Sequence, residues 1–274
     1  MTIMESSASH DSDLRFTFPE LHPTVEDMFL LEAHQIMELQ TRVREADLAA
    51  LLQEHPAVYR YLWHRCPEVA TWLRSLRSQY PPVDGVTLLE AEQTLLWNIA
   101  DWIVYQRAPE LYDMLPIHDW DFSAVTNVVD ITAKTVLDAG AGTGRVGFEA
   151  AKLADGVFAV EPTTGLRAYM RREALASATT NLFVMDGLLH AVPLAMNHVD
   201  VVITCRAIGW HLEEELEEID RLLAPGGTDV HLTGIPSPAD HHDPLHERLM
   251  QQGYTADTYF EQATLMCRYW KTRR

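Results

Sequence analysis

Apolar, β-branched segments alternate with amphipathic segments through the second half of the chain, and this alternation restricts the fold more than any other feature. The segments that favour strands are residues 135–140, 156–161, 181–186, 198–204 and 228–234. The segments between them with helical spacing are residues 144–155, 164–175 and 212–227. Strands that alternate with helices form a parallel sheet covered by helices on both faces. We therefore predict a doubly wound α/β domain.

The end of the chain breaks this alternation. A helical segment at residues 242–253 is followed by two strand-like segments, 254–262 and 263–273, that are separated only by a short turn. Two strands joined in this way pair antiparallel. The complete prediction is a mostly parallel, seven-stranded sheet whose last strand is antiparallel.

The first half of the chain carries helical signals only. Residues 1–22 begin with Ser, Asp and His, and we expect them to be disordered or loosely ordered. Residues 23–120 contain Pro56 and Pro67 at positions where helices begin, and five of the seven tryptophans of the chain. The expected division is a loose N-terminus, an all-helical domain at 23–120 and the sheet domain at 121–274.

A glycine-rich turn joins the first predicted strand to its helix in the segment Val136–Arg145, VLDAGAGTGR. Gly140, Gly142 and Gly144 allow the backbone to turn sharply and to approach a ligand that a Cβ would exclude. Residues 142–147 also satisfy GxGxxG, a pattern that dinucleotide-binding folds share. Glu161 ends the next strand, where a carboxylate can accept hydrogen bonds from both ribose hydroxyls. At this point NAD and S-adenosylmethionine are both possible cofactors.

Further features favour S-adenosylmethionine. Asp138 extends the turn to Asp-x-Gly-x-Gly-x-Gly, Asp186 ends the third strand, and Leu222–Gly227 reads LLAPGG before the fifth strand. With the closing pair of strands, this order resembles the class I S-adenosylmethionine-dependent methyltransferases, which have a Rossmann-like fold. The likeness covers about residues 130–274 and is closest to the small-molecule group that includes the ubiquinone and menaquinone C-methyltransferases. Residues 1–120 resemble no known family.

The resemblance implies contacts with the cofactor S-adenosylmethionine, whose product is S-adenosylhomocysteine. The methionine part would lie against Asp138 and the turn residues Ala139, Gly140, Gly142 and Gly144. Glu161 would bind the ribose hydroxyls, and Pro162 would pack beside the adenine.

The same resemblance places the rest of the cofactor at the next two strand ends. Asp186 would accept a hydrogen bond from the adenine amino group, and the Gly187 backbone would meet the ring edge. Cys205 would lie near the methionine end. The segment Cys205–His211 departs from the family pattern, because the family more often has a small polar residue and a pair of histidines there.

The candidate catalytic residues are Arg206, Trp210 and His211, which follow the fourth strand at the edge where an acceptor would bind. A general base is needed only when the acceptor is protonated, and histidine is the usual residue. For His211, a structural role at the start of a helix is an equal alternative. The acidic run Glu213–Glu218 is interpreted as a solvated helix face.

Charge and cysteine content restrict the partners. The formal net charge is −19, and both halves are acidic, at −13 for residues 1–130 and −6 for residues 131–274. Nucleic-acid binding requires a positive surface, so DNA and RNA are not expected as substrates. Three separated cysteines and no apolar run of membrane-spanning length indicate a soluble, cytoplasmic protein without a membrane partner. His242 and His246 lack further ligands, so no metal site is predicted.

The predicted function is methyl transfer from S-adenosylmethionine to a small-molecule acceptor. The helical domain, with its aromatic residues, would form the wall or lid of the acceptor pocket or would mediate dimerisation, so a homodimer is one possibility. The alternatives are an NAD(P)-dependent oxidoreductase, a protein methyltransferase, and a non-catalytic protein that binds S-adenosylmethionine as a scaffold.

Overall fold

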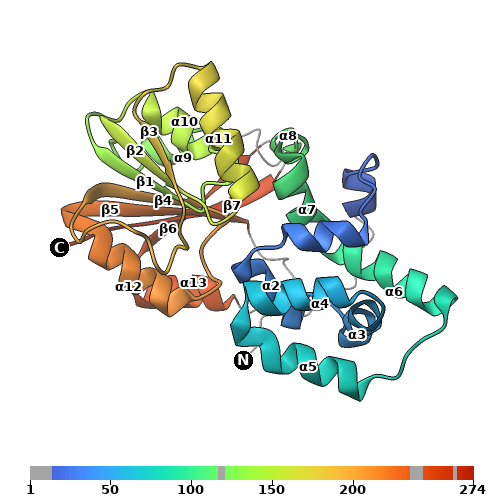
Figure 1. Ribbon diagram of the computed structural model, residues 1–274. Coiled ribbons are helices and arrows are strands. Elements are labelled where there is room, and N and C mark those ends of the chain that lie inside the picture. The colour runs from blue at the N-terminus through green and yellow to red at the C-terminus, as the bar shows by residue number, and fades with distance from the viewer. Residues whose placement is uncertain (1–13, 117–120, 235–242, 262–263) are drawn as a thin grey trace. The chain divides into compact units, whose positions relative to one another are not determined.

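A seven-stranded sheet forms the centre of the second half of the chain, as the alternation predicted (Figure 1). Its strands are β1 (Thr135–Ala139), β2 (Gly156–Val160), β3 (Leu182–Met185), β4 (Val199–Cys205), β5 (Leu223–Gly234), β6 (Thr255–Glu261) and β7 (Thr264–Thr272). Their order is β3-β2-β1-β4-β5-β7-β6. The first five strands are parallel, and β7 is antiparallel to both β5 and β6. The predicted fold class is confirmed.

The computed structural model describes residues 14–116, 121–234, 243–261 and 264–274. The chain consists of two units, Met1–Tyr112 and Asp113–Arg274. The division lies eight residues before the boundary expected at residue 120. Asp113 belongs with the sheet because its carboxylate accepts hydrogen bonds from Arg145 and from Tyr169 in that unit.

Helices cover both faces of the sheet, as Figure 1 shows. One face packs against α9 (Ser123–Thr126), α10 (Arg145–Ala151) and α11 (Thr164–Ala176). The other face packs against α12 (Leu212–Leu222) and α13 (Pro244–Gln251). Consecutive side chains of a strand point to opposite faces, so Val136 enters the first core and Leu137 the second. Burial on both faces explains why these strands are continuously apolar.

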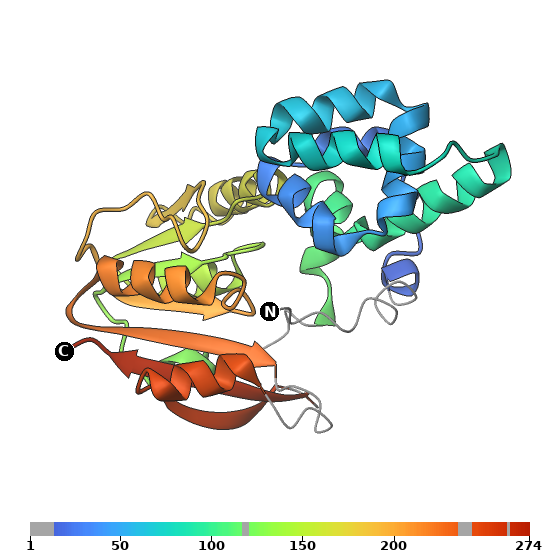
Figure 2. The ribbon, with the colours of Figure 1, turned by 90° about the horizontal axis from the view of Figure 1, so that it is seen from below.

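The fifth strand is longer than the sequence indicated. β5 begins at Leu223 and so includes the Pro225-Gly-Gly227 segment, which the sequence placed with the preceding helical segment and before the strand. Its pairing with β4 shifts register between Val199 and Val201, which is a bulge in the ladder, and Gly226 has φ +81°. In Figure 2, β5 (the long orange strand) runs beside the red C-terminal hairpin of β6 and β7.

The helical unit is built around one central helix. Its elements are the 3-10 helices η1 (Val25–Leu30) and η2 (Pro67–Val69) and the helices α2 (Ala33–Arg42), α3 (Glu45–Glu54), α4 (Pro56–Arg65), α5 (Ala70–Gln79), α6 (Gly85–Asn98), α7 (Ala100–Arg107) and α8 (Pro109–Asp113). α3 packs against α4, α5 and α6. Residues Asp47–Leu52 of α3 are all buried, as expected for a helix surrounded by others.

The expectation of a loosely ordered N-terminus was wrong for its last part. Residues 14–17 are helical, and Phe18 and Leu21 are buried. Two large apolar side chains in the core supply the burial that the Ser- and His-rich composition of the preceding residues lacks. Residues 1–13, and with them the rest of that prediction, lie outside the described residues, as do Trp120, His241 and His242.

Candidate functional site

The parallel strands β1, β2, β3 and β4 end at the same edge of the sheet, and every predicted cofactor residue lies at or just after one of these ends. β1 ends in Asp138 and Ala139, β2 is followed by Glu161, β3 by Asp186, and β4 ends in Cys205. Ligands of open α/β sheets bind at this carboxyl edge, where neighbouring connections leave toward opposite faces. The observed strand order therefore brings the predicted residues to one edge of the sheet.

The glycine turn has the backbone conformation that its sequence predicted. Gly140, Gly142 and Gly144 have φ values of +72°, +57° and +86°. A Cβ at Gly140 would lie 2.3 Å from the Cβ of Ala207, and one at Gly144 would lie 2.9 Å from Met170. Both glycines are therefore fixed by conformation and by space. The contact with Ala207 also shows that the loop after β4 reaches the glycine turn.

Asp138 ties the glycine turn to the start of α10. Its buried carboxylate accepts a hydrogen bond from the backbone N–H of Gly147, with Oδ2 and N 2.8 Å apart. Burial raises the pKa of Asp138 from 3.8 to about 7, the Gly147 hydrogen bond opposes this, and the charge of Glu161 adds to it. A carboxylate that costs this much to ionise gains from a cationic ligand nearby.

Glu161 also holds loop backbone. Oε2 accepts from the N–H of Gly142 at 3.0 Å, and Oε1 accepts from the N–H of Thr163 at 2.8 Å. Burial raises the pKa of Glu161, and the two backbone hydrogen bonds and the charge of Arg167 lower it in part. The predicted ribose ligand therefore links β2 to the glycine turn in this structure.

Asp186 is the most accessible of the three acids, with a side chain that is 73% exposed. Its Oδ1 lies 3.0 Å from Nη1 of Arg167, which also donates to the backbone oxygen of Glu161. Arg167 was not among the residues predicted from the sequence. Its position in the first turn of α11, six residues after Glu161, would have been the only signal. This buried guanidinium joins the ends of β2 and β3.

The remaining predicted cofactor residues lie beside these acids. Pro162 follows Glu161 and is partly exposed. A Cβ at Gly187 would lie 2.9 Å from both Pro193 and Val160, so only glycine fits there. Burial raises the pKa of Cys205 to about 12, which keeps its thiol protonated and unreactive at neutral pH.

The three candidate catalytic residues share the loop between β4 and α12. Arg206 has φ +57°, a conformation uncommon outside glycine, and its guanidinium lies 3.4 Å from Oε2 of Glu261. Trp210 is 66% exposed. The imidazole of His211 meets that of His190 edge to face, with ring centroids 4.8 Å apart. Sequence reasoning missed His190, which comes from the loop between β3 and β4.

The solvated-face interpretation of Glu213–Glu218 was wrong for two of its members. Glu215 is 2% exposed, and its carboxylate accepts hydrogen bonds from Gly209 and His211. Glu218 pairs with Arg221 at 2.6 Å and accepts from the N–H of Val192. The apolar stripe of α12 occupies the sheet side, and these two acids lie next to it, facing loops instead of water.

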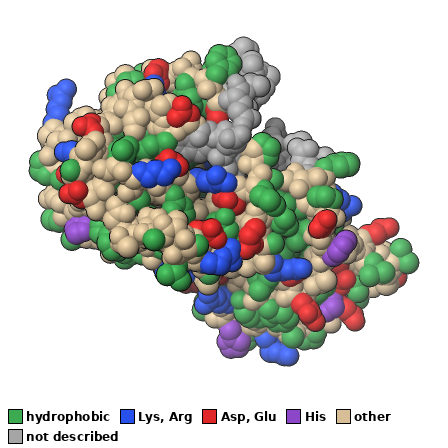
Figure 3. All heavy atoms as spheres, turned by 90° about the horizontal axis from the view of Figure 1, so that it is seen from above, with side chains coloured by type: hydrophobic (Ala, Val, Ile, Leu, Met, Phe, Trp, Pro, Cys, Tyr) green, Lys and Arg blue, Asp and Glu red, His purple; other side chains and the backbone are tan. Residues whose placement is uncertain are grey.

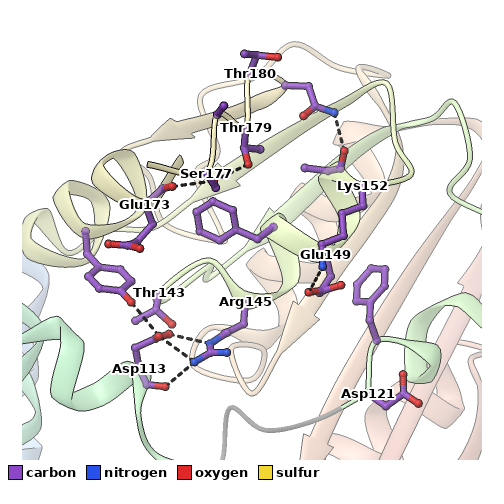
Figure 4. Close-up of a pocket in the computed structure, with 16 residues that line it drawn as sticks. Asp113, Asp121, Thr143, Arg145, Glu149, Lys152, Glu173, Ser177, Thr179 and Thr180 are labelled. Carbon is purple, nitrogen blue, oxygen red and sulfur yellow. Dashed lines mark hydrogen bonds and ion pairs between the residues drawn. The ribbon is translucent and has the colours of Figure 1, made fainter. Parts of the chain in front are cut away.

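A cavity of about 870 Å³ lies along α10 and α11 (Figure 4). Thr143 and Arg145 line it, but Asp138, Glu161 and Asp186 do not. At one end, Arg145 points to Asp113 and donates to its carboxylate at 2.8 and 2.9 Å. Burial raises the pKa of Asp113, but the hydrogen bonds from Arg145 and Tyr169 and the charge of Arg145 outweigh it and lower the pKa. The cavity is therefore separate from the strand-end site, although Thr143 and Arg145 adjoin both.

Two other sequence expectations concern metals and membranes. Within the described ranges, no three His, Cys, Asp or Glu side chains converge on a possible metal position. His246 instead lies 2.9 Å from the hydroxyl of Tyr269 through Nδ1. No helix in the described part of the chain is both long and apolar enough to span a membrane.

Basic side chains on the drawn face of the molecule are dispersed. Figure 3 shows Lys and Arg mostly beside acidic groups, without a continuous basic patch on that face. Several arginines are in ion pairs, among them Arg145 with Asp113 and Arg248 with Glu213. The face in view therefore offers no extended positive surface of the kind that a phosphate backbone requires.

Comparisons with known proteins bear on the same segment. The model of the methyltransferase domain family matches residues 136–227, from β1 to the bulge of β5. No curated protein matches the chain.

Three solved structures are among those similar to part of this chain. An S-adenosylmethionine-dependent methyltransferase from Aquifex aeolicus is 18% identical over 59% of this chain and 94% of its own, with a TM-score of 0.49. Precorrin-6y C5,15-methyltransferase from Geobacter metallireducens is 19% identical over 56% of this chain and 85% of its own, with a TM-score of 0.45. Phosphoethanolamine N-methyltransferase 1 from Haemonchus contortus, in complex with phosphoethanolamine and S-adenosylhomocysteine, is 16% identical over 63% of this chain and 47% of its own, with a TM-score of 0.47.

The matched segment contains the glycine turn and the acids at the ends of β1, β2 and β3. The likeness to the quinone subgroup stays a prediction, because the family model does not distinguish subgroups. Residues 136–227 of this chain match the methyltransferase domain family, and the cofactor is S-adenosylmethionine.

Proposed function

We propose that the chain transfers the methyl group of S-adenosylmethionine to a small-molecule acceptor at the carboxyl edge of the sheet. The observation that carries the proposal is the convergence of a glycine turn, three strand-end acids and the 206–211 loop, which bears Arg206, Trp210 and His211. Methyl transfer requires an activated methyl group and a nucleophile held in line with it. The residues at the strand ends would hold the cofactor with its activated methyl group. The 206–211 loop would hold the nucleophile in line with that group.

The residues at the edge fit the cofactor in charge and shape. The buried Asp138 carboxylate suits the ammonium of the methionine part, and Glu161 has two oxygens for two ribose hydroxyls. The exposed Asp186 side chain can accept from an adenine amino group. Gly140 and Gly144 leave backbone where a Cβ cannot fit, so the turn is built for close approach.

The chain's own groups would orient the acceptor and handle its proton. When bound, the cofactor supplies a methyl group already activated by its sulfonium. His211 would accept the proton of a hydroxyl or amine acceptor, and Trp210 offers an indole face against which an apolar acceptor can lie. Arg206 would bind an anionic group of the acceptor.

Transfer of an isotope-labelled methyl group tests the proposal. The purified full chain is incubated with methyl-labelled S-adenosylmethionine and, separately, with a metabolite extract and with the protein fraction of the same cells. We expect label in a low-mass compound, and much less label in that compound when the Glu161→Ala variant is used at the same cofactor concentration. Label in proteins alone would assign a protein acceptor. Cofactor binding without transfer to either fraction would support the non-catalytic alternative.

A further inference from the structure

Glu215 lies at the start of α12 and is buried, whereas its neighbours Glu214 and Glu217 are exposed. Its Oε2 accepts from the N–H of Gly209 at 2.6 Å, and its Oε1 accepts from the N–H of His211 at 3.0 Å. Both oxygens of one carboxylate therefore bind backbone of the loop that carries the three candidate catalytic residues. This use is distinct from cofactor binding, because none of the strand-end acids contacts Gly209 or His211 in the described hydrogen bonds.

Burying a carboxylate is costly unless hydrogen bonds replace its water. Glu215 receives two charge-assisted hydrogen bonds, which are stronger than neutral ones. It also lies near the N-terminus of an 11-residue helix, where the helix dipole favours negative charge. The backbone N–H of Glu215 in turn donates to the carbonyl of His211 at 2.8 Å. His211, the residue before the helix, is thus held from both its N–H and its carbonyl.

The loop backbone needs such support, because two of its residues have unusual conformations. Gly209 has φ +116°, which L side chains rarely adopt, and Arg206 has φ +57°. Glycine adopts such a φ without steric cost, so Gly209 leaves the loop free to move unless contacts fix it, and at Arg206 the conformation costs energy that surrounding contacts must offset. Glu215 supplies the contact on both sides of Trp210, whose side chain is exposed. The backbone that carries the exposed Trp210 indole is therefore held in place at the carboxyl edge of the sheet.

α12 holds the neighbouring loop in the same way. Oε1 of Glu218 accepts from the N–H of Val192 at 2.8 Å, and Arg221 donates to the carbonyls of Val192 and Leu194. Val192 lies two residues after His190, whose ring meets His211. One helix thus fixes the backbone beside both imidazoles of this edge.

We propose that Glu215 is a positioning residue for methyl transfer. Its carboxylate fixes Gly209 and His211, and through them the directions of Trp210 and His211 toward the acceptor. The inference rests on the proposed function for its consequence in catalysis. The contact itself is independent of whether the acceptor is a small molecule.

Amide hydrogen exchange measured by NMR on the full chain tests the contact directly. In the Glu215→Gln variant we expect the amides of Gly209 and His211 to exchange at least about tenfold faster than in the wild type, because one charged acceptor is replaced by a neutral oxygen and an amide donor. Glu214→Gln, an exposed acid one residue away, should change neither rate. Affinity for S-adenosylhomocysteine should stay within about twofold in both variants, because other carboxylates hold the cofactor loops.

A second variant perturbs the loop from the other side. Gly209→Ala meets only Leu245, at 3.9 Å, so it adds strain at φ +116° without a clash. It should accelerate exchange at His211 as Glu215→Gln does. Unchanged exchange at Gly209 and His211 in Glu215→Gln would overturn the proposal, and so would an equal acceleration across all of α12, which would indicate a role in helix stability alone.

Catalysis supplies the last readout. With the acceptor found by methyl labelling, Glu215→Gln should lower kcat at least about tenfold and leave the KM for S-adenosylmethionine unchanged, whereas Glu214→Gln should alter neither. Equal kcat values in Glu215→Gln and the wild type would refute the positioning role. Failure of the wild type to bind S-adenosylhomocysteine would refute the proposed function and leave the exchange result standing.

Discussion

The acids of the two units differ in their main partners. In the helical unit, the buried Asp27 pairs with Arg107 at 2.8 Å, and the partly buried Asp101 pairs with Arg42 at 2.8 Å. In the sheet unit, Asp138 accepts a hydrogen bond from a backbone N–H at the start of α10, and Glu161 and Glu215 accept from backbone N–H groups of loops. The first kind of acid links helices that are distant in sequence. The second kind shapes the loops at the edge where a ligand binds.

This difference has an electrostatic consequence. A carboxylate paired with a guanidinium is neutralised, whereas one held by amides keeps its formal charge available to a nearby ligand. The raised pKa values of Asp138 and Glu161 are the mark of burial without a directly bound cation. Under the proposed function, the acids that hold these loops are the groups that would bind an ammonium and ribose hydroxyls.

The largest expected effect comes from Gly140→Ala. The new Cβ would lie 2.3 Å from the Cβ of Ala207, at a φ of +72°, so strain and overlap add. We expect a loss of about 3 kcal/mol or more in the free energy of unfolding, measured by denaturant titration, and no detectable binding of S-adenosylhomocysteine.

Alanine variants of two other glycines distinguish the cost of backbone strain from the cost of steric overlap. Gly226→Ala has φ +81° but nothing within 4 Å, so it should cost about 1 kcal/mol. Gly85→Ala, at the first turn of α6 in the helical unit, meets neither problem and should be neutral or stabilising by up to about 1 kcal/mol. Equal losses in all three variants would show that the glycine turn has no special constraint.

The next effect compares one acid from each unit. Glu161→Ala should weaken the binding of S-adenosylhomocysteine by about 1.5–3 kcal/mol in calorimetry, the range for hydrogen bonds to a charged group. Asp27→Ala removes the partner of Arg107 and should lower the melting temperature without changing the affinity. If Asp27→Ala weakens the binding of S-adenosylhomocysteine as much as Glu161→Ala does, the functional division between the two kinds of acid is wrong.

The smallest effect is a pH dependence. The pKa of Asp138 is about 7 in the folded chain and ordinarily 3.8, so the native state retains this proton between those values. For this group, stability falls as the pH rises from about 4 to about 7 and is level above that range.

A cationic ligand favours the charged form of Asp138. Affinity for S-adenosylhomocysteine should therefore rise by roughly tenfold between pH 5.5 and 7.5 and then level off. Asp138→Asn should remove this dependence. A flat profile in the wild type would place the ammonium of the ligand away from Asp138.

The sequence predicted the elements of the sheet unit well because each depends on local periodicity. The strands β1 to β4 and the glycine turn lie where the apolar segments and Gly140, Gly142 and Gly144 predicted them. The start of β5 was missed, because a bulge allows Pro225 and Gly226 to remain in a strand. The start of β5 depends on how this strand pairs with β4, and the sequence of one segment does not contain that information.

Side-chain partners were harder to predict. The run Glu213–Glu218 looks uniformly solvated in sequence, yet Glu215 is buried because a loop from the end of β4 folds back over the helix start. Arg167 and His190 were missed for the same reason, since each acquires its role from a neighbour on another element. Periodicity identifies the face that packs on the sheet, but not the acids that face a loop beside it.

Calorimetry with S-adenosylhomocysteine and with NAD tests the central assignment most directly, because the glycine turn and Glu161 suit both kinds of ligand in sequence alone. The strand-end site predicts one tight site per chain for S-adenosylhomocysteine, a raised melting temperature with that ligand, and no response to NAD. Tight binding of NAD with no response to S-adenosylhomocysteine would contradict it.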